Sequence, residues 1–259
     1  MKTTRGRETV DSKPGWRLPR SVVRWSAAAL PAILGVFVGA GPVPAMAYAP
    51  ETASAVRDAA AIHHVPTVPL SINGRPVPGE TILAYNGYVL HMAYFPGSDG
   101  APGRLHTFTT PDALEKFVHS RGGPEHALAK PSKHANPDTP GVGWRVVGPG
   151  ARGGDGVSSY GWDTTGSIIF EHMEFSGCGL FLEKNYGYQR LTHVYGCMWP
   201  NDWNDETSSV KNSPYGSTAT VLYEHTYYNG STLYIPYSGF NHYLEGVGWN
   251  DRTSSFASI

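Results

Sequence analysis

Cysteine and charged residues are both scarce in this chain of 259 residues, and their scarcity excludes several kinds of protein. The two cysteines are too few for a thiolate metal cluster. Only 16% of the residues are charged, whereas 31 glycines, 21 prolines and 15 tyrosines favour β structure and loops over a helical bundle. The sequence contains no His-Glu-x-x-His or Gly-x-Ser-x-Gly pattern, and its eleven histidines fit no compact ligand set. We therefore expect no enzymatic activity.

Basic residues are concentrated at the N-terminus. Residues 1–47 hold seven of the 20 basic residues and two of the 21 acidic ones, so the rest of the chain has 13 basic and 19 acidic residues, a net charge of −6. A net negative charge gives no electrostatic attraction to nucleic acid or to anionic lipid, but it attracts cations. We expect neither a nucleic-acid partner nor membrane association of the mature chain.

The N-terminus has the organisation of an export signal. A basic region ends at Arg24 and is followed by an apolar run, 25–38, which is short and interrupted by proline. The small-x-small site Ala45-Met46-Ala47 then predicts a signal peptide over residues 1–47 and a mature start at Tyr48. The predicted localisation is therefore secreted, and an uncleaved anchor is the alternative.

The mature chain is expected to consist of four segments. Residues 48–66 are polar and Ala-rich and are predicted to be disordered, and residues 123–164 are rich in Gly and Pro and are predicted to be a flexible linker. Between them, 67–122 is predicted to be a small β-rich module with one helix, and 165–259 is the C-terminal domain. Within the linker, a patch at 142–147 could dock locally.

The 67–122 module has clear local signals but no catalytic constellation. Strands are predicted near 72–77 and 105–109, with a hairpin about Asn86-Gly87 inside 82–95. Thr110 offers an N-cap for a helix whose apolar residues have helical spacing. The module could be a packing unit, a prosegment or a wall-binding unit.

Residues 165–259 contain an internal repeat. The segment 170–177 (FEHMEFSG) matches 223–230 (YEHTYYNG) 53 residues later, and 203–210 (WNDETSSV) matches 249–256 (WNDRTSSF) 46 residues later. The first pattern predicts a folded hairpin with glycine at positive φ, and the second predicts a tight arch shaped by Asx and hydroxyl side chains. Two such units would bury alternating aromatic and aliphatic residues between two sheets.

The first repeat carries seven more residues between its two motifs than the second. Cys197 lies in this insertion and Cys178 follows the first hairpin, so export and an even cysteine count predict one disulfide between them. Closing a loop of this size stabilises a fold by about 3 kcal/mol. The loop 193–203 also contains Met198 and Trp199, which makes it a candidate contact surface. The plainer alternative is that it covers a sheet edge.

The aromatic-x₄-aromatic-x-Gly signature, followed by Asn-Asp-x-x-Ser-Ser, resembles the βγ-crystallin family, and both signatures occur twice in order. The resemblance implies a mainly β protein with a double Greek-key sandwich, preceded by a small α+β module and a linker. It also implies two Ca²⁺ ions, as in microbial members with this hexapeptide. Similarity to secreted metalloproteinase inhibitors and killer-toxin-like proteins of this fold implies an alternative, in which the 193–203 loop binds a secreted protease or another extracellular protein.

Oxygen-bearing residues of the repeat fit the needs of Ca²⁺, which takes six to eight oxygen ligands at about 2.3–2.6 Å. The arches offer carboxylates, hydroxyls and main-chain carbonyls, and the family pattern implies that the hairpin of the other repeat completes each ion through main-chain oxygens. The predicted metal-binding residues are Asp205, Glu206, Ser208, Asp251, Arg252, Ser254, Glu171 and Glu224. Arg252 would contribute its carbonyl, and its charge would weaken that site. The metal would stabilise the fold, and the alternative is a pair of well-capped arches without metal.

Overall fold

The structure is a computed structural model that describes residues 55–98, 101–136, 138, 143–147, 165–194, 202–214, 217–237, 240–241 and 243–259. All of these belong to the compact unit that spans Met46–Ile259. The predicted signal peptide, Cys197 and residues 195–201 of the 193–203 loop lie outside the described residues. Within the described ranges, no helix is long and apolar enough to cross a membrane.

The described chain is mainly β, with one α-helix and several short 3₁₀ helices. The N-terminal part contains β1 (Leu70–Ile72), β2 (Arg75–Val77), η1 (Gly79–Tyr85), β3 (His91–Phe95), β4 (Arg104–Phe108), α1 (Pro111–Ser120), β5 (Lys133–His134) and β6 (Trp144–Val147). The first repeat contains β7 (Gly166–His172), η2 (Met173–Phe175), β8 (Ser176–Glu183), β9 (Tyr186–Tyr188), η3 (Leu191–His193) and β10 (Ser209–Asn212). The second repeat contains β11 (Thr220–His225), β12 (Asn229–Ile235), β13 (Phe240–Asn241), η4 (Leu244–Val247) and β14 (Ser255–Ser258).

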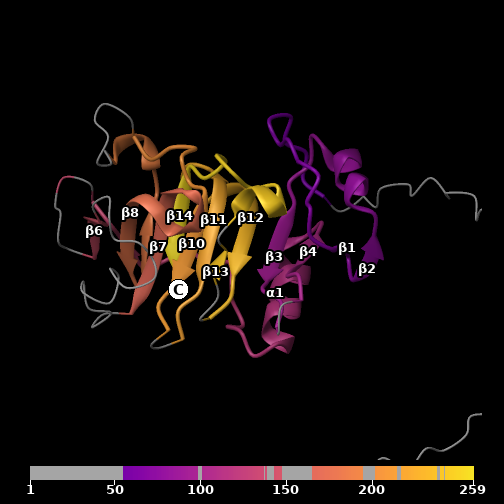
Figure 1. Cartoon of the computed structure of the whole chain (residues 1–259), viewed down its shortest axis with the longest axis horizontal. Helices are drawn as coiled ribbons and strands as arrows, with labels where there is room; N and C mark the ends of the chain where they lie inside the picture. Colours follow the sequence, from indigo (N-terminus) through magenta and orange to yellow (C-terminus); the bar gives the residue numbers. More distant parts are fainter. Residues whose placement is uncertain are drawn as a thin grey trace, which may run out of the picture. The chain divides into compact units, whose positions relative to one another are not determined.

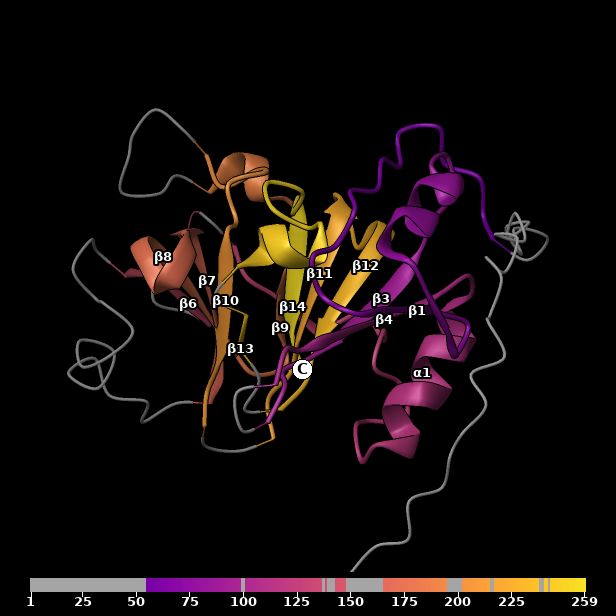
Figure 2. The same ribbon diagram turned by 45° about the vertical axis from the view of Figure 1, so that its right-hand side comes forward.

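Each repeat contributes one strand to the sheet of the other repeat. One sheet has the order β13-β10-β7-β8-β6, so the second repeat's β13 extends three strands of the first. The other sheet contains β12-β11-β14-β9, so the first repeat's β9 extends three strands of the second. In Figure 2, β8, β7, β6, β10 and β13 lie to the left of β14, β11 and β12. This exchange joins two Greek keys into one sandwich, which confirms the predicted fold class.

The two hairpins have matching irregularities. Each contains a register shift, between Phe170 and His172 in one and between Tyr223 and His225 in the other. The glycine that ends each motif, Gly177 or Gly230, has a φ of 77°. A side chain is strained at this φ, so glycine is the residue that allows the chain to turn back. The repeat seen in the sequence is therefore a repeat in backbone geometry.

The N-terminal strands continue the second repeat's sheet, contrary to the arrangement expected from the sequence. β3 pairs in parallel with β12, and the sheet runs on through β4, β1 and β2. Figure 1 shows β3 beside β12, with β4 on the far side of β3. Leu90 and Met92 share one buried cluster with Leu233 and Ile235. The 67–122 module and the C-terminal domain therefore share a sheet and a core.

Parts of the predicted linker and of the predicted disordered segment are also structured. β5 pairs with β9 and β6 pairs with β8, so each sheet gains an edge strand from 123–164. The prediction of a flexible linker was wrong for these strands, and the expected docking of the 142–147 patch is confirmed for β6. Within 48–66, described from residue 55 onward, Ala61 and His63 are buried, so the prediction of disorder was wrong there too.

Within the N-terminal module the local signals were partly right. β1 and β2 form a hairpin about Asn73-Gly74, and Thr110 caps α1 by accepting a hydrogen bond from the amide of Ala113 at 3.3 Å. The predicted hairpin about Asn86-Gly87 does not form, because Gly79–Tyr85 is the helix η1. Ile82 and Tyr85 are spaced three residues apart and both point into the core. α1 packs on β3 and β4.

We expect the described unit to unfold in one cooperative transition, because the N-terminal strands and the second repeat bury their apolar residues in one cluster. Calorimetry of the mature chain should give a single peak. A Leu90→Ala variant removes a buried side chain of the N-terminal part. It should move the whole peak to a lower temperature and lower the free energy of unfolding by about 2–5 kcal/mol. Two separate peaks, of which only one moves in Leu90→Ala, would show that the parts fold independently.

Candidate metal centre

The last serine of each arch links the arch to the hairpin of its own repeat through two hydrogen bonds. The Ser209 hydroxyl donates to the carbonyl oxygen of His172 at 2.7 Å and accepts from the amide of Phe175 at 3.2 Å. In the second repeat, Ser255 makes the same pair of bonds to His225 and Tyr228, at 2.7 Å and 3.1 Å. These hydroxyls satisfy main-chain groups of the left-handed hairpin turns, which explains the serine at this position.

The preceding serine lies beside the predicted hairpin ligand of the same repeat. The amide of Ser208 donates to the carbonyl of Phe170 at 2.9 Å, and the amide of Ser254 donates to the carbonyl of Tyr223 at 3.0 Å. Phe170 directly precedes Glu171, and Tyr223 directly precedes Glu224. Each repeat therefore brings its own serine and its own hairpin glutamate together.

The main-chain amide of each aspartate is hydrogen-bonded to the arch of the other repeat. The amide of Asp205 donates to the carbonyl of Thr253 at 3.0 Å, and the amide of Asp251 donates to the carbonyl of Thr207 at 3.3 Å. Both aspartates have a left-handed backbone conformation, with φ of 57° for Asp205 and 53° for Asp251. The Ser254 hydroxyl lies 3.4 Å from Asp205 Oδ1. Asp205 thus meets the serine of the second arch.

These contacts define two candidate sites. Site A contains Glu171, Glu206, Ser208 and Asp251, and site B contains Glu224, Arg252, Ser254 and Asp205. The sequence analysis expected each site to combine one arch with the hairpin of the other repeat. In the structure, the serine and the hairpin of one repeat lie with the aspartate of the other repeat.

An unsatisfied oxygen accompanies each aspartate, and the sequence did not single it out. Asn204 donates through Nδ2 to Asp205 Oδ2 at 2.6 Å, and Asn250 donates to Asp251 Oδ2 at 2.5 Å. The Oδ1 atoms of both asparagines are buried and have no hydrogen-bond partner in the described part. A buried acceptor without a donor is costly, and a cation would satisfy it together with the neighbouring carboxylate. The residues present therefore fit a hard cation.

The donor set differs from that of a transition-metal site. Among the described residues, no three His, Cys, Asp or Glu side chains are grouped so that they could hold a metal ion. Ca²⁺ accepts hydroxyl, amide and main-chain oxygens as readily as carboxylates, so one aspartate per site suffices. The exchanged strands, the paired hairpins and the crossed arches together identify the architecture. Residues 165–259 have the βγ-crystallin fold.

Comparison with known proteins finds similar structures only. No protein-family model and no curated protein matches the chain. A structure from work on the evolution of the eye-lens βγ-crystallin domain fold is 22% identical, with a TM-score of 0.32, and the match covers 37% of this chain and 86% of that one. A βγ-crystallin from an archaeon is 22% identical, with a TM-score of 0.29 and coverage of 38% and 100%. Spherulin 3a from Physarum polycephalum is 22% identical, with a TM-score of 0.29 and coverage of 36% and 82%. At these values the fold assignment rests on the strand exchange and the duplicated arches.

Site A is acidic. Burial raises the pKa of the Glu206 carboxyl, and the negative charges of Asp251 and Glu171 raise it further. Partial desolvation likewise raises the pKa of Asp205 and Asp251, although both residues remain accessible to solvent. Burial and neighbouring negative charge thus disfavour the ionised carboxylates, and a bound cation would favour them.

Site B contains its own positive charge. Arg252 Nη2 lies 2.6 Å from Glu224 Oε1, and these side chains are only 8% and 9% exposed. Arg252 also donates to the carbonyl of Gly248 at 2.8 Å, and Glu224 Oε2 accepts from the amide of Ser231 at 3.2 Å. Burial opposes ionisation of Glu224, but Arg252 and these hydrogen bonds outweigh it and lower the pKa of the carboxyl. The Glu224 side chain is thus held by protein groups.

The N-terminal segment contacts the surroundings of site B, which the sequence did not suggest because 48–66 has the composition of a disordered segment. Asp58 Oδ2 lies 2.7 Å from Nε2 of His225, the residue after Glu224. The carbonyl oxygen of His64 packs so closely on Gly248 that a Cβ there would approach it to 2.6 Å. Cys178 is buried in β8, and its predicted disulfide to Cys197 lies outside the described residues.

We expect Glu224→Gln to destabilise the domain more than the matched change Glu171→Gln, because only the former leaves a buried arginine without its counter-charge. Removing one partner of a buried ion pair costs about 3–5 kcal/mol. Urea unfolding of both variants at pH 7 measures the difference. Equal losses in the two variants would show that the Arg252–Glu224 pair does not stabilise the fold.

The same pair predicts the acid response. The pKa of Glu224 is lower in the folded state than its ordinary 4.5, so its stabilisation is present above pH 4.5 and is lost as the pH falls through the folded value. The wild-type free energy of unfolding should therefore decrease below pH 4.5 more steeply than that of Glu224→Gln. Parallel curves for the two proteins would contradict the assignment.

Proposed function

We propose that residues 165–259 are a Ca²⁺-binding βγ-crystallin domain of a secreted protein, in which the metal stabilises the fold and takes no part in catalysis. The single observation that supports this most is the buried, unpartnered Oδ1 of Asn204 and of Asn250, each beside a carboxylate at a crossed arch. Two equivalent oxygens in two equivalent places are unlike an isolated packing defect, and Ca²⁺ prefers this mixture of ligands.

Binding would strengthen the contact between the repeats. Each ion would draw an aspartate of one arch toward the serine hydroxyl and the hairpin carbonyl of the other repeat. Because those groups come together only in the folded sandwich, the metal would bind the native state selectively. At 100 times its dissociation constant, such a ligand stabilises the native state by about 2.7 kcal/mol.

The two sites should be unequal. Site A has Glu206 where site B has Arg252, and Glu206 lies in the field of four further carboxylates, those of Asp251, Glu171, Asp202 and Asp205. In site B, a guanidinium lies against Glu224 and the 58–64 segment lies against the hairpin and Gly248. Coulomb attraction therefore favours Ca²⁺ at site A, and repulsion by Arg252 weakens site B.

Secretion, signal-peptide cleavage and the disulfide support an extracellular, calcium-rich setting, and they stay predictions from the sequence. The alternative function, binding of a secreted protease or another extracellular protein through the 193–203 loop, also stays a prediction. The middle of that loop lies outside the described residues.

The decisive test compares the wild type with an Asp205→Asn, Asp251→Asn double variant in chelator and in Ca²⁺. Without metal, the double variant should be at least as stable as the wild type, because it loses two carboxylates whose ionisation is disfavoured by burial. With saturating Ca²⁺, the wild-type melting temperature should rise, and that of the double variant should not.

Glu125→Gln is the matched control, because it removes an exposed carboxylate far along the sequence from both arches. It should respond to Ca²⁺ as the wild type does. A wild-type melting temperature that is the same in chelator and in Ca²⁺ refutes the proposal, as does an unchanged calcium response in the double variant.

The inequality of the sites can be tested by exchanging the residue that distinguishes them. Glu206→Arg gives site A the charge of site B, and we expect its calcium affinity to fall at least about tenfold, equivalent to 1.4 kcal/mol. Calorimetric titration of the wild type should resolve a tighter and a weaker event, and only the tighter one should be lost. If Glu206→Arg lost the weaker binding event instead, site A would be the weaker site and the assignment of the two events would be wrong.

A further inference from the structure

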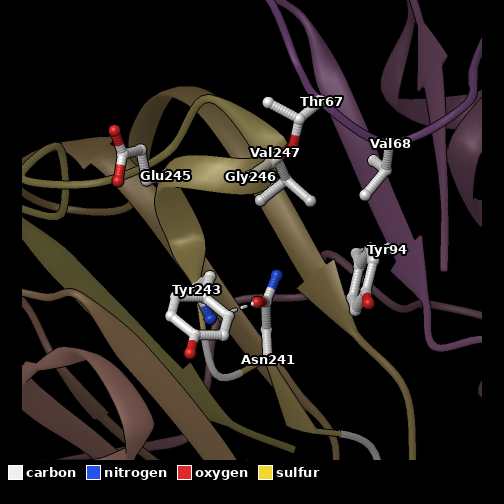
Figure 3. A pocket seen from close by; sticks show the side chains of 8 residues that line it. All are labelled: Thr67, Val68, Tyr94, Asn241, Tyr243, Glu245, Gly246 and Val247. Atoms are coloured by element: carbon white, nitrogen blue, oxygen red, sulfur yellow. Dashed lines mark hydrogen bonds between the residues drawn. The ribbon is translucent and has the colours of Figure 1, made fainter. Parts of the chain in front are cut away.

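A pocket lies between the N-terminal strands and the second repeat, separate from the arches of the candidate metal sites. Its volume is about 450 Å³, within the range of small-molecule sites. The residues that line it are Thr67, Val68, Tyr94, Asn241, Tyr243, Glu245, Gly246 and Val247. Figure 3 shows Tyr94 of β3, Val68 of the segment before β1, Asn241 of β13 and Val247 of η4 around one space, with the Glu245 carboxylate directed away from it. The pocket exists only because the N-terminal part adds to the crystallin sheet.

Asn241 provides an unused hydrogen-bond donor in this pocket. The residue is 5% exposed, and its Oδ1 accepts from the amide of Tyr243 at 2.8 Å. Its Nδ2 is buried and has no hydrogen-bond partner in the described part of the chain. In Figure 3 this nitrogen points into the space between Val247 and Tyr94. A buried amide donor without an acceptor indicates that an oxygen from elsewhere belongs there.

Two tyrosines give the pocket aromatic walls. Tyr243 is 48% exposed, and a hydrogen bond with the carboxylate of Glu174 raises the pKa of its phenol. Figure 3 shows the Tyr243 hydroxyl directed away from the pocket, so this bond holds the ring in place and leaves it beside the opening. Tyr94 is half-buried on the other side, packed over Gly103. An aromatic ring with an accessible face binds the apolar face of a ligand and keeps its polar edge free.

The charge of the lining restricts the ligand. Among the lining residues that the structure describes, Glu245 is the only charged one, and it is exposed at the rim. An anion would be repelled there and would find no basic partner. A quaternary ammonium could pack on the tyrosines, but it has no oxygen for the Asn241 donor. A neutral ligand with both apolar faces and hydroxyl oxygens satisfies the rings and the amide together.

We propose that this pocket binds a short neutral saccharide, with a sugar ring on the tyrosine side and a hydroxyl oxygen accepting from Asn241 Nδ2. The apolar walls from Val68 and Val247 exclude water from part of the ring, and Glu245 can accept from a hydroxyl at the rim. The inference is independent of calcium binding. It gives the N-terminal part a function beyond covering the sheet edge.

The experiment uses the full mature chain and follows its amide and tyrosine ring NMR signals during titration. The probes are glucose, mannose, galactose, N-acetylglucosamine, cellobiose and maltose, each at millimolar concentration, with tetramethylammonium chloride as the cationic comparison. At least one saccharide should shift the signals of Tyr243 and Asn241 in a saturable way, and the ammonium salt should not. No saturable shift with any saccharide, or saturation only with the ammonium ion, overturns the proposal.

Asn241→Asp is the sharpest variant, because aspartate keeps the oxygen that accepts from Tyr243 but replaces the donor with a second acceptor. Its saccharide affinity should fall at least about tenfold. Because a buried carboxylate also lowers the melting temperature, the titration is done at a temperature at which the amide spectrum shows the variant to be folded. Tyr243→Ala should also lose binding, and Tyr227→Ala, which removes an exposed tyrosine outside the pocket, should keep it. Undiminished binding in Asn241→Asp would contradict the assigned role of the amide.

Discussion

Two main-chain hydrogen bonds that cross between the arches determine most of this architecture. The amide of each aspartate donates to the carbonyl of a threonine in the other repeat. To reach it, Asp205 and Asp251 adopt left-handed backbone conformations, which aspartate and asparagine tolerate better than most residues. Because the crossing also places Asp205 against Ser254, neither repeat can assemble a site alone. Closure of the sandwich and formation of the candidate metal sites are therefore a single structural event.

The second constraint is that the edge strand β12 of the second repeat's sheet must be paired. β12 would otherwise present unpaired main-chain groups, which natural proteins avoid leaving open. Here β3 pairs with it in parallel, and a serine hydroxyl of β12 accepts a further bond from the amide of Leu90. The chain that leads to these strands then packs against η4, where the amide of Thr67 donates to the carbonyl of Gly246. The N-terminal part thus completes the sheet, contacts the surroundings of one candidate metal site and forms one side of the pocket at Asn241.

The duplicated domain could be predicted from the sequence because its signals are local and occur twice. Gly177, Gly230 and the two Asn-Asp-x-Thr-Ser-Ser arches each specify a short piece of backbone, and a constant offset reveals the repeat. The parallel pairing of β3 with β12 joins residues that are more than a hundred positions apart, and no local pattern encodes it. β5 and β6 are two and four residues long, too short for a strand periodicity to be visible within Gly- and Pro-rich surroundings. The ligand grouping was also beyond reach, because which serine meets which aspartate depends on how the repeats cross.

One substitution between the repeats has consequences for the whole domain. Where the first arch has Glu206, the second has Arg252, and the guanidinium neutralises the hairpin carboxylate of Glu224 from within the protein. The first repeat has the equivalent carboxylate, Glu171, whose Oε2 accepts from the amide of Cys178 at 3.2 Å, but it has an acidic residue where the arginine would be. Its negative charges have no protein cation equivalent to Arg252 in the second arch. On this reasoning the two halves of the sandwich differ in their source of positive charge, an arginine in one and the proposed ion in the other, and the proposed stabilisation by calcium would originate mainly at site A.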